Sequence, residues 1–148
     1  MERREKPLFR RDVADTNLFG VLGLVHKEQA DSMFLAWLLD PRGTHGQGSL
    51  FLSVFLDLCG LSDCSGYIDD PTCIALMALY VENKIGSCEG PQQTQREYRD
   101  LQRQGEARSI PEEYRKAVYL TPSGVSPEEE TKGQWITLSH RELAESLR

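Results

Sequence analysis

Residues 73–85 constrain the fold more than any other part of the chain. They read CIALMALYVENKI, an apolar run that acquires charge only near its end. An apolar run of this length fits a buried strand, and Tyr80 and Val81 favour a strand in its second half. Helix is the competing interpretation, because alanine, leucine and methionine favour it. The chain is therefore expected to build around at least one buried strand.

Helical patterns lie on both sides of this segment. Residues 28–39 carry a wide apolar face at near-helical spacing. Pro41 ends that helix, because the residue before a proline avoids helical geometry. A second helix is predicted at residues 49–58 and a polar helix at residues 92–104.

Short strands and a final helix complete the pattern. Strands are predicted at residues 67–69, 117–120 and 134–138. Ser139 then begins a helix, and Glu142 follows three residues later, which is the spacing of a capping box. The alternation of helices and strands predicts an α/β sandwich around a small mixed sheet flanked by helices.

The length of the chain fits one domain. We expect residues 1–16 to form a charged lead-in and residues 17–148 to form the domain. Residues 61–70 are predicted to be loop-like, apart from the short strand within them, and residues 128–133 to form a solvated loop.

Composition narrows the possible functions. The net charge of −6 weighs against tight, nonspecific binding of nucleic acid. No stretch approaches the ~20 apolar residues of a membrane span, and no signal peptide is evident, so no membrane partner and a cytoplasmic location are expected. The four cysteines contain no CxxC pair, which argues against a structural zinc site and favours reduced thiols.

Glu82 and Lys84 bring charge to the end of the buried strand. Residues two apart on a strand share a face, so Glu82 and Lys84 should project together while Val81 and Asn83 face the other way. One interpretation is a strand that emerges into solvent. The other is a metal site, because Mg²⁺ prefers carboxylate and carbonyl oxygens such as Glu82 and the backbone carbonyl of Asn83. A second carboxylate would then come from a neighbouring element.

The stretch LYVENKIGS at residues 79–87 resembles the (D/E)xK strand of the PD-(D/E)XK nuclease superfamily. The segments FLAWLLDP (34–41), HG (45–46), FL (51–52), QTQREY (93–98) and VYLTPSG (118–124) resemble one uncharacterised branch of that superfamily, in the same order. The resemblance implies a restriction-endonuclease-like α/β fold. It also implies hydrolysis of nucleic-acid phosphodiester bonds, with DNA as the expected substrate and Mg²⁺, or Mn²⁺, as the cofactor.

The resemblance assigns the metal ligands and the catalytic pair. Glu82 and Lys84 match the (D/E)xK pair, with Lys84 acting on the attacking water. Asp69, in an Ile-Asp pair before that strand, matches the superfamily's other acidic residue, so Asp69, Glu82 and Asn83 are the predicted metal ligands. Asp70 competes with Asp69, because residues 70–72 also read as a turn.

Three further residues match the superfamily's pattern less closely. Gln93 lies near its glutamine on the following helix, but it precedes Tyr98 by five residues rather than four. A surface glutamine is therefore the alternative. Glu28 matches an acidic residue of the first helix, with an ordinary solvated side chain as the alternative. His45 matches a histidine of the superfamily, and a purely structural role for His45 in its loop is the alternative.

The sequence also departs from the superfamily. Members of the superfamily have considerably more chain between the second helix and the (D/E)xK strand, where this sequence has only residues 61–67. The sheet is therefore expected to lack a strand and the domain to be shortened. Arg96, Arg99 and Arg103 could contact phosphates or form a solvated helix face. The alternative function is a degenerate, non-catalytic module or truncated product that acts in binding only.

Overall fold

The computed structural model describes residues 22–23, 27–65, 77–86, 90, 92–127 and 131–147. Three strands form one sheet in the order β1 (Ala78–Asn83), β2 (Arg115–Thr121), β3 (Ile136–Ser139). Both neighbouring pairs are parallel. A mixed sheet was predicted, and the three described strands pair only in parallel. The strand predicted at residues 67–69 lies outside the described residues.

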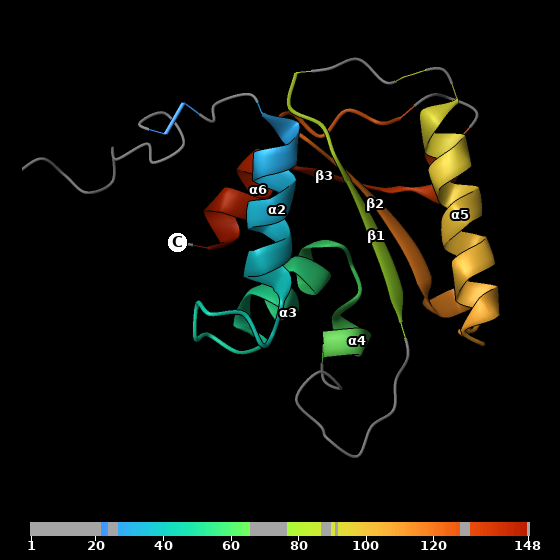
Figure 1. The fold of residues 1–148 in the computed structure, drawn as a ribbon, viewed down its shortest axis with the longest axis horizontal. Helices are drawn as coiled ribbons and strands as arrows, with labels where there is room; N and C mark the ends of the chain where they lie inside the picture. Colours follow the sequence, from blue (N-terminus) through green and yellow to red (C-terminus); the bar gives the residue numbers. More distant parts are fainter. Residues whose placement is uncertain are drawn as a thin grey trace, which may run out of the picture.

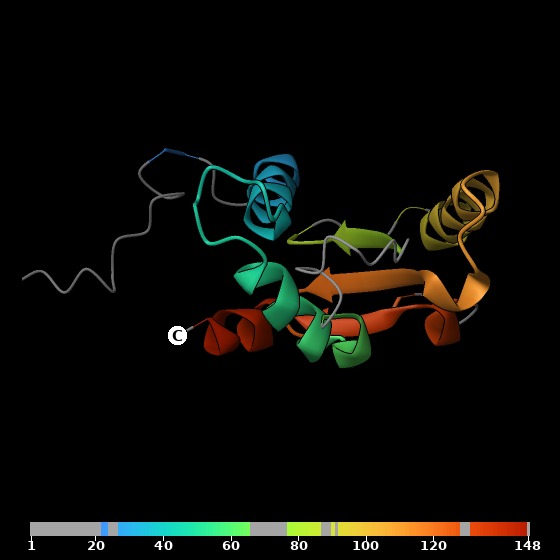
Figure 2. The ribbon, with the colours of Figure 1, turned by 90° about the horizontal axis from the view of Figure 1, so that it is seen from below.

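Helices cover both faces of this sheet (Figures 1 and 2). Helix α5 packs on one face against β1 and β2, while α2 contacts β1 and α6 contacts β3 on the other. Two short 3₁₀ turns, η2 (Glu112–Tyr114) and η3 (Lys132–Gln134), precede β2 and β3. The architecture is α/β and consistent with a shortened restriction-endonuclease-like fold. The helices are α2 (Glu28–Leu39), α3 (Leu50–Leu58), α4 (Ser62–Ser65), α5 (Gln93–Ala107) and α6 (His140–Ser146).

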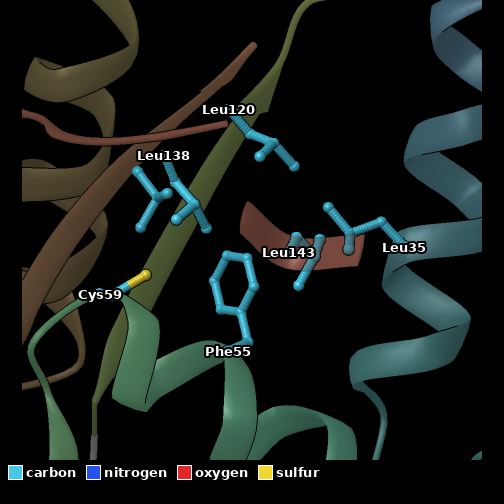
Figure 3. Packing of buried hydrophobic residues seen from close by; sticks show 7 residues of the cluster. Leu35, Phe55, Cys59, Leu120, Leu138 and Leu143 are labelled. Atoms are coloured by element: carbon cyan, nitrogen blue, oxygen red, sulfur yellow. The ribbon is translucent and has the colours of Figure 1, made fainter. Parts of the chain in front are cut away.

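Strand β2 supplies apolar side chains to both faces of the sheet. Val118 and Leu120 enter a core shared with α2, α3, α6 and β3, in which Phe55 is completely buried (Figure 3). Ala117 and Tyr119 alternate with them and enter a second cluster on the α5 side. This two-sided burial explains why β2 reads as a continuous apolar run rather than an alternating one.

The core on the α3 side also contains a free cysteine, Cys59. Burial raises the pKa of the Cys59 thiol to about 11. The thiol therefore stays protonated at neutral pH and behaves as a small apolar side chain.

The ends of two helices confirm their sequence predictions. Helix α2 runs from Glu28 to Leu39, and the backbone of Asp40 is extended, as expected before a proline. At α6, Ser139 Oγ accepts a hydrogen bond from Glu142 N at 3.1 Å, and Glu142 Oε2 accepts one from Ser139 N at 2.8 Å. These reciprocal bonds are the predicted capping box.

Two predicted loops differ from the structure. Residues 62–65 form the single helical turn α4, and the acidic Asp63 in that turn is favourable at a helix N-terminus. The sequence predicts a solvated loop around Thr131, but this residue is 2% exposed. Its Oγ1 lies 2.9 Å from Oγ1 of the buried Thr94 on α5, so a hydrogen bond compensates the burial of both hydroxyls.

No helix in the described part of the chain combines the length and the apolar character that crossing a membrane requires.

Candidate active site at the end of strand β1

Strand β1 directs Tyr80, Glu82 and Lys84 toward helix α5. Ala78 and Tyr80 pack in the α5-side cluster, and alternation along the strand places Glu82 on the same face. Lys84 N donates to Leu120 O at 2.9 Å, so the pairing with β2 continues one residue beyond the strand.

Glu82 and Lys84 form a nearly buried ion pair. Lys84 Nζ lies 3.2 Å from Glu82 Oε1, and the two side chains are 11% and 13% exposed, respectively. The interpretation of a strand emerging into solvent is therefore wrong. A carboxylate and an ammonium this shielded from water interact more strongly than a surface pair does.

Gln93, at the start of α5, joins the members of this site. Its Nε2 donates to Glu82 Oε1 and to Glu97 Oε1, both at 2.8 Å. Its Oε1 accepts from Lys84 Nζ at 3.0 Å and from Gly90 N at 3.2 Å. The side-chain amide thus uses both donor hydrogens and both acceptor positions. Gln93 is half-buried and contacts both Glu82 and Lys84, while its catalytic role stays a prediction.

The sequence analysis did not assign two residues of this site. Tyr80 donates from its hydroxyl to Glu82 Oε2 at 3.3 Å. Glu97 accepts from Gln93, one helical turn earlier. Sequence spacing could have identified both residues. Tyr80 stands two residues before Glu82 on a strand, so the two share a face, and Glu97 stands four residues after Gln93 on a helix, so these two are neighbours.

Burial and neighbouring charge perturb both of these groups. Burial is the main reason that the pKa of the Glu97 carboxyl lies above its usual value; hydrogen bonding from Gln93 opposes this shift, and the negative charge of Glu82 adds to it. Burial is also the main reason that the pKa of the Tyr80 hydroxyl is raised, and the negative charges of Glu97 and Glu82 raise it further. The phenol is therefore neutral at physiological pH and acts as a hydrogen-bond donor.

Asn83 points to the other face of β1, as predicted from alternation. Its Nδ2 donates to Ser32 Oγ on α2 at 3.3 Å, and its Oδ1 lies 2.7 Å from His140 Nε2 on α6. Burial lowers the pKa of His140, and the charge of Asp31 partly opposes this. The Asn83 side chain thus ties β1 to two helices, while the role of its backbone carbonyl as a metal ligand remains a prediction.

Glu28 fixes the backbone that follows the ion pair. Its Oε1 accepts hydrogen bonds from Ile85 N at 3.1 Å and Gly86 N at 3.5 Å. These contacts join the first turn of α2 to the chain directly after Lys84. Glu28 is therefore more than an ordinary solvated side chain, and its position suits a supporting role.

His45 has the structural role that was its alternative. Its Nε2 lies 2.9 Å from Asp40 O, and its Nδ1 accepts from Gln47 N at 3.1 Å. The ring also packs edge-on against Trp37 and Phe51. These contacts hold the connection between α2 and α3.

The arginines of α5 lie on its outer face. Arg96, Arg99 and Arg103 are all exposed. Arg103 pairs with Asp100 at 2.8 Å, and both of these side chains are more than half exposed. An ion pair this exposed contributes little to stability.

Comparison with known proteins supports the resemblance seen in the sequence. A model of the PD-(D/E)XK nuclease superfamily matches residues 16–78. Over this stretch, less than half of its length, the chain is similar to this superfamily. The matched residues contain α2, α3 and α4 and end at the first residue of β1. Comparison with curated proteins and with solved structures gave no match.

Similarity to the PD-(D/E)XK nuclease superfamily points to a nucleic-acid substrate and a divalent metal. Asp69 and Asp70, predicted for the second carboxylate position, lie outside the described residues. Within the described ranges, no three histidine, cysteine, aspartate or glutamate side chains converge as metal ligands. The oxygen-rich site nevertheless fits a hard cation, because Glu97 Oε2 is buried beside it without a hydrogen-bond partner.

Proposed function

We propose that the chain is a metal-dependent nuclease that hydrolyses nucleic-acid phosphodiester bonds, with DNA as its substrate. The observation that supports this proposal is the nearly buried pair of Glu82 and Lys84, held together by one glutamine. A carboxylate to hold a cation and an ammonium to meet phosphate charge are the groups that metal-assisted phosphodiester hydrolysis requires.

Each described residue has a defined part in this proposal. Glu82 would bind Mg²⁺ or Mn²⁺. Asp69 and the backbone carbonyl of Asn83 are the other predicted ligands. When bound, such a cation lowers the pKa of water and neutralises phosphate charge. Lys84 positions the attacking water and stabilises negative charge on the phosphate. Gln93 fixes Lys84 against Glu82, and the contacts of Glu28 keep the following backbone in place.

Preorganisation is the physical advantage of this arrangement. Lys84 Nζ contacts both Glu82 Oε1 and Gln93 Oε1, so the ammonium is already placed before substrate arrives. Groups held in advance do not have to be reorganised during the reaction, which lowers its barrier. Because the net charge of the chain is −6, affinity for a polyanion would depend on local positive charge such as that of Arg96 and Arg99.

Plasmid cleavage in the presence of Mn²⁺ or Mg²⁺ tests the proposal. Lys84→Ala should reduce cleavage by about 10²-fold or more, in the range typical for loss of one charge-stabilising group. Arg42→Ala removes a cation that is 94% exposed and should leave cleavage unchanged. Equal cleavage by wild type and Lys84→Ala, or cleavage by neither, would contradict an enzymatic role. Binding of DNA without cleavage would instead indicate the non-catalytic module.

A further inference from the structure

Helix α5 brings a second carboxylate to the proposed metal site. The sequence analysis expected that carboxylate from Asp69, on a strand before β1. We propose that Glu97 holds this position, so that Glu82 and Glu97 together bind the divalent cation. The inference rests on the proposed function, because it assigns a ligand for the same cation.

The distance between the two carboxylates supports this assignment. Glu82 Oε1 and Glu97 Oε1 each lie 2.8 Å from the same atom, Gln93 Nε2. The two oxygens are therefore separated by no more than twice that distance. An ion bonded to both carboxylates at an ordinary Mg²⁺–oxygen distance holds two oxygens at most about 4.2 Å apart, a separation that this upper limit allows.

The hydrogen bonding of Glu97 is incomplete without a further partner. Its Oε1 accepts from Gln93, but its Oε2 is buried and meets no donor. A buried polar atom left unpaired destabilises the fold, and more so when the group is charged. A cation bonded to Oε2 would compensate that cost, and water would fill the remaining coordination positions, as is usual for Mg²⁺.

The charges in the site also favour a bound cation. The ammonium of Lys84 can balance only one of the two carboxylates, and the nearby phenol of Tyr80 brings no positive charge. Glu97 and Tyr80 line a hollow of about 330 Å³ between β1 and α5, with Asp100 and Gln104 among its other lining residues. Of the two carboxylates, only Glu97 lines this hollow, and Arg108 lines it as well.

Binding of Mn²⁺ alone tests the inference without relying on activity. Titration of Mn²⁺ followed by electron paramagnetic resonance of the free ion gives affinity, and the melting temperature reports binding independently. Glu97→Gln and Glu82→Gln should each weaken Mn²⁺ binding by about tenfold or more, and each should remove most of the thermal shift. Glu106→Gln is the matched control, because this carboxylate lies on the same helix and is 72% exposed.

The outcomes separate the inference from the proposed function. If Glu97→Gln binds Mn²⁺ as wild type does while Glu82→Gln does not, Glu97 is not a ligand, although the metal-dependent function stands. If wild type binds no Mn²⁺, both proposals fail. If Glu97→Gln does not fold, Glu97→Asp is the second variant, because it keeps the carboxylate on a side chain that is shorter by one methylene group. Its Mn²⁺ affinity should fall, and unchanged affinity would overturn the inference.

Discussion

Gly105 on α5 lies directly against the side chain of Arg115 at the start of β2. A Cβ atom at Gly105 would be 2.5 Å from both Cδ and Nε of Arg115. The guanidinium is fixed there, because Nε donates to Ile110 O at 2.8 Å and Nη1 donates to Gln102 Oε1 at 3.0 Å. The missing side chain at Gly105 thus allows Arg115 to fasten the end of α5 to the sheet.

Gly105→Ala should lower the free energy of unfolding by about 1–2 kcal/mol. Alanine gains about 1 kcal/mol over glycine inside a helix. Displacing Arg115 weakens two charge-assisted hydrogen bonds, each worth about 1.5–3 kcal/mol, which outweighs that gain. Urea denaturation measures the difference. Gly133→Ala, where an added Cβ meets nothing within 4 Å, is the control and should be nearly neutral. A more stable Gly105→Ala protein would show that Arg115 moves aside at no cost.

Lys84→Met should destabilise the fold by about 3 kcal/mol, because it leaves the carboxylate of Glu82 unpaired in a site largely shielded from water. Replacing Glu82 by glutamine in the same chain removes that uncompensated charge. The double variant should therefore be more stable than the sum of the two single changes predicts. A double-mutant cycle by chemical denaturation measures this coupling. Additive changes would mean that the ion pair contributes nothing to stability.

Phe55→Ala should be among the most destabilising changes in the core. The side chain is 0% exposed and packs between α3 and the sheet, so its removal should cost about 3–5 kcal/mol (Figure 3). Phe34→Ala is the matched control, since Phe34 is 43% exposed on α2 and should cost much less. Similar losses for both variants would contradict the described core.

Glu142 should contribute an acid-sensitive part of the stability. Hydrogen bonds from the hydroxyl and the backbone of Ser139 lower the pKa of Glu142 below its usual 4.5. A carboxyl whose pKa is depressed by folding stabilises the protein above the unfolded-state value and loses that contribution as pH falls through the folded pKa. Glu142→Gln should therefore flatten the fall of melting temperature below pH 4.5.

The control for this pH dependence is Glu145→Gln, on the same helix. It leaves the reciprocal bonds between Ser139 and Glu142 in place. Its melting temperature should follow the wild-type pH profile. If Glu142→Gln retains the full wild-type acid dependence, the capping box does not account for it.

Features with a local cause could be predicted from the sequence. Helix α2 followed from its apolar spacing and from Pro41, and α6 followed from the capping box of Ser139. The shared face of Glu82 and Lys84 followed from strand alternation. Each of these signals lies within one element, so no knowledge of tertiary packing was needed.

Features that depend on packing between elements could not be predicted in the same way. The five-residue spacing between Gln93 and Tyr98 did not decide whether Gln93 faces the site. The structure shows the position of its side chain through hydrogen bonds to Glu82 and Lys84. Thr131 reads as a polar loop residue, and only its contact with Thr94 explains its burial. In both cases a partner distant in sequence decides the environment.

The described site occupies one short segment of chain, from Tyr80 on β1 to Glu97 on α5. An insertion within α5 between Gln93 and Glu97 would turn one of them by about 100° for each added residue, so the two side chains would no longer share a face. Insertions between α3 and β1 would leave these spacings untouched. Length can therefore vary upstream of β1 over evolution, while the four-residue spacing from Gln93 to Glu97 cannot change without separating these two side chains.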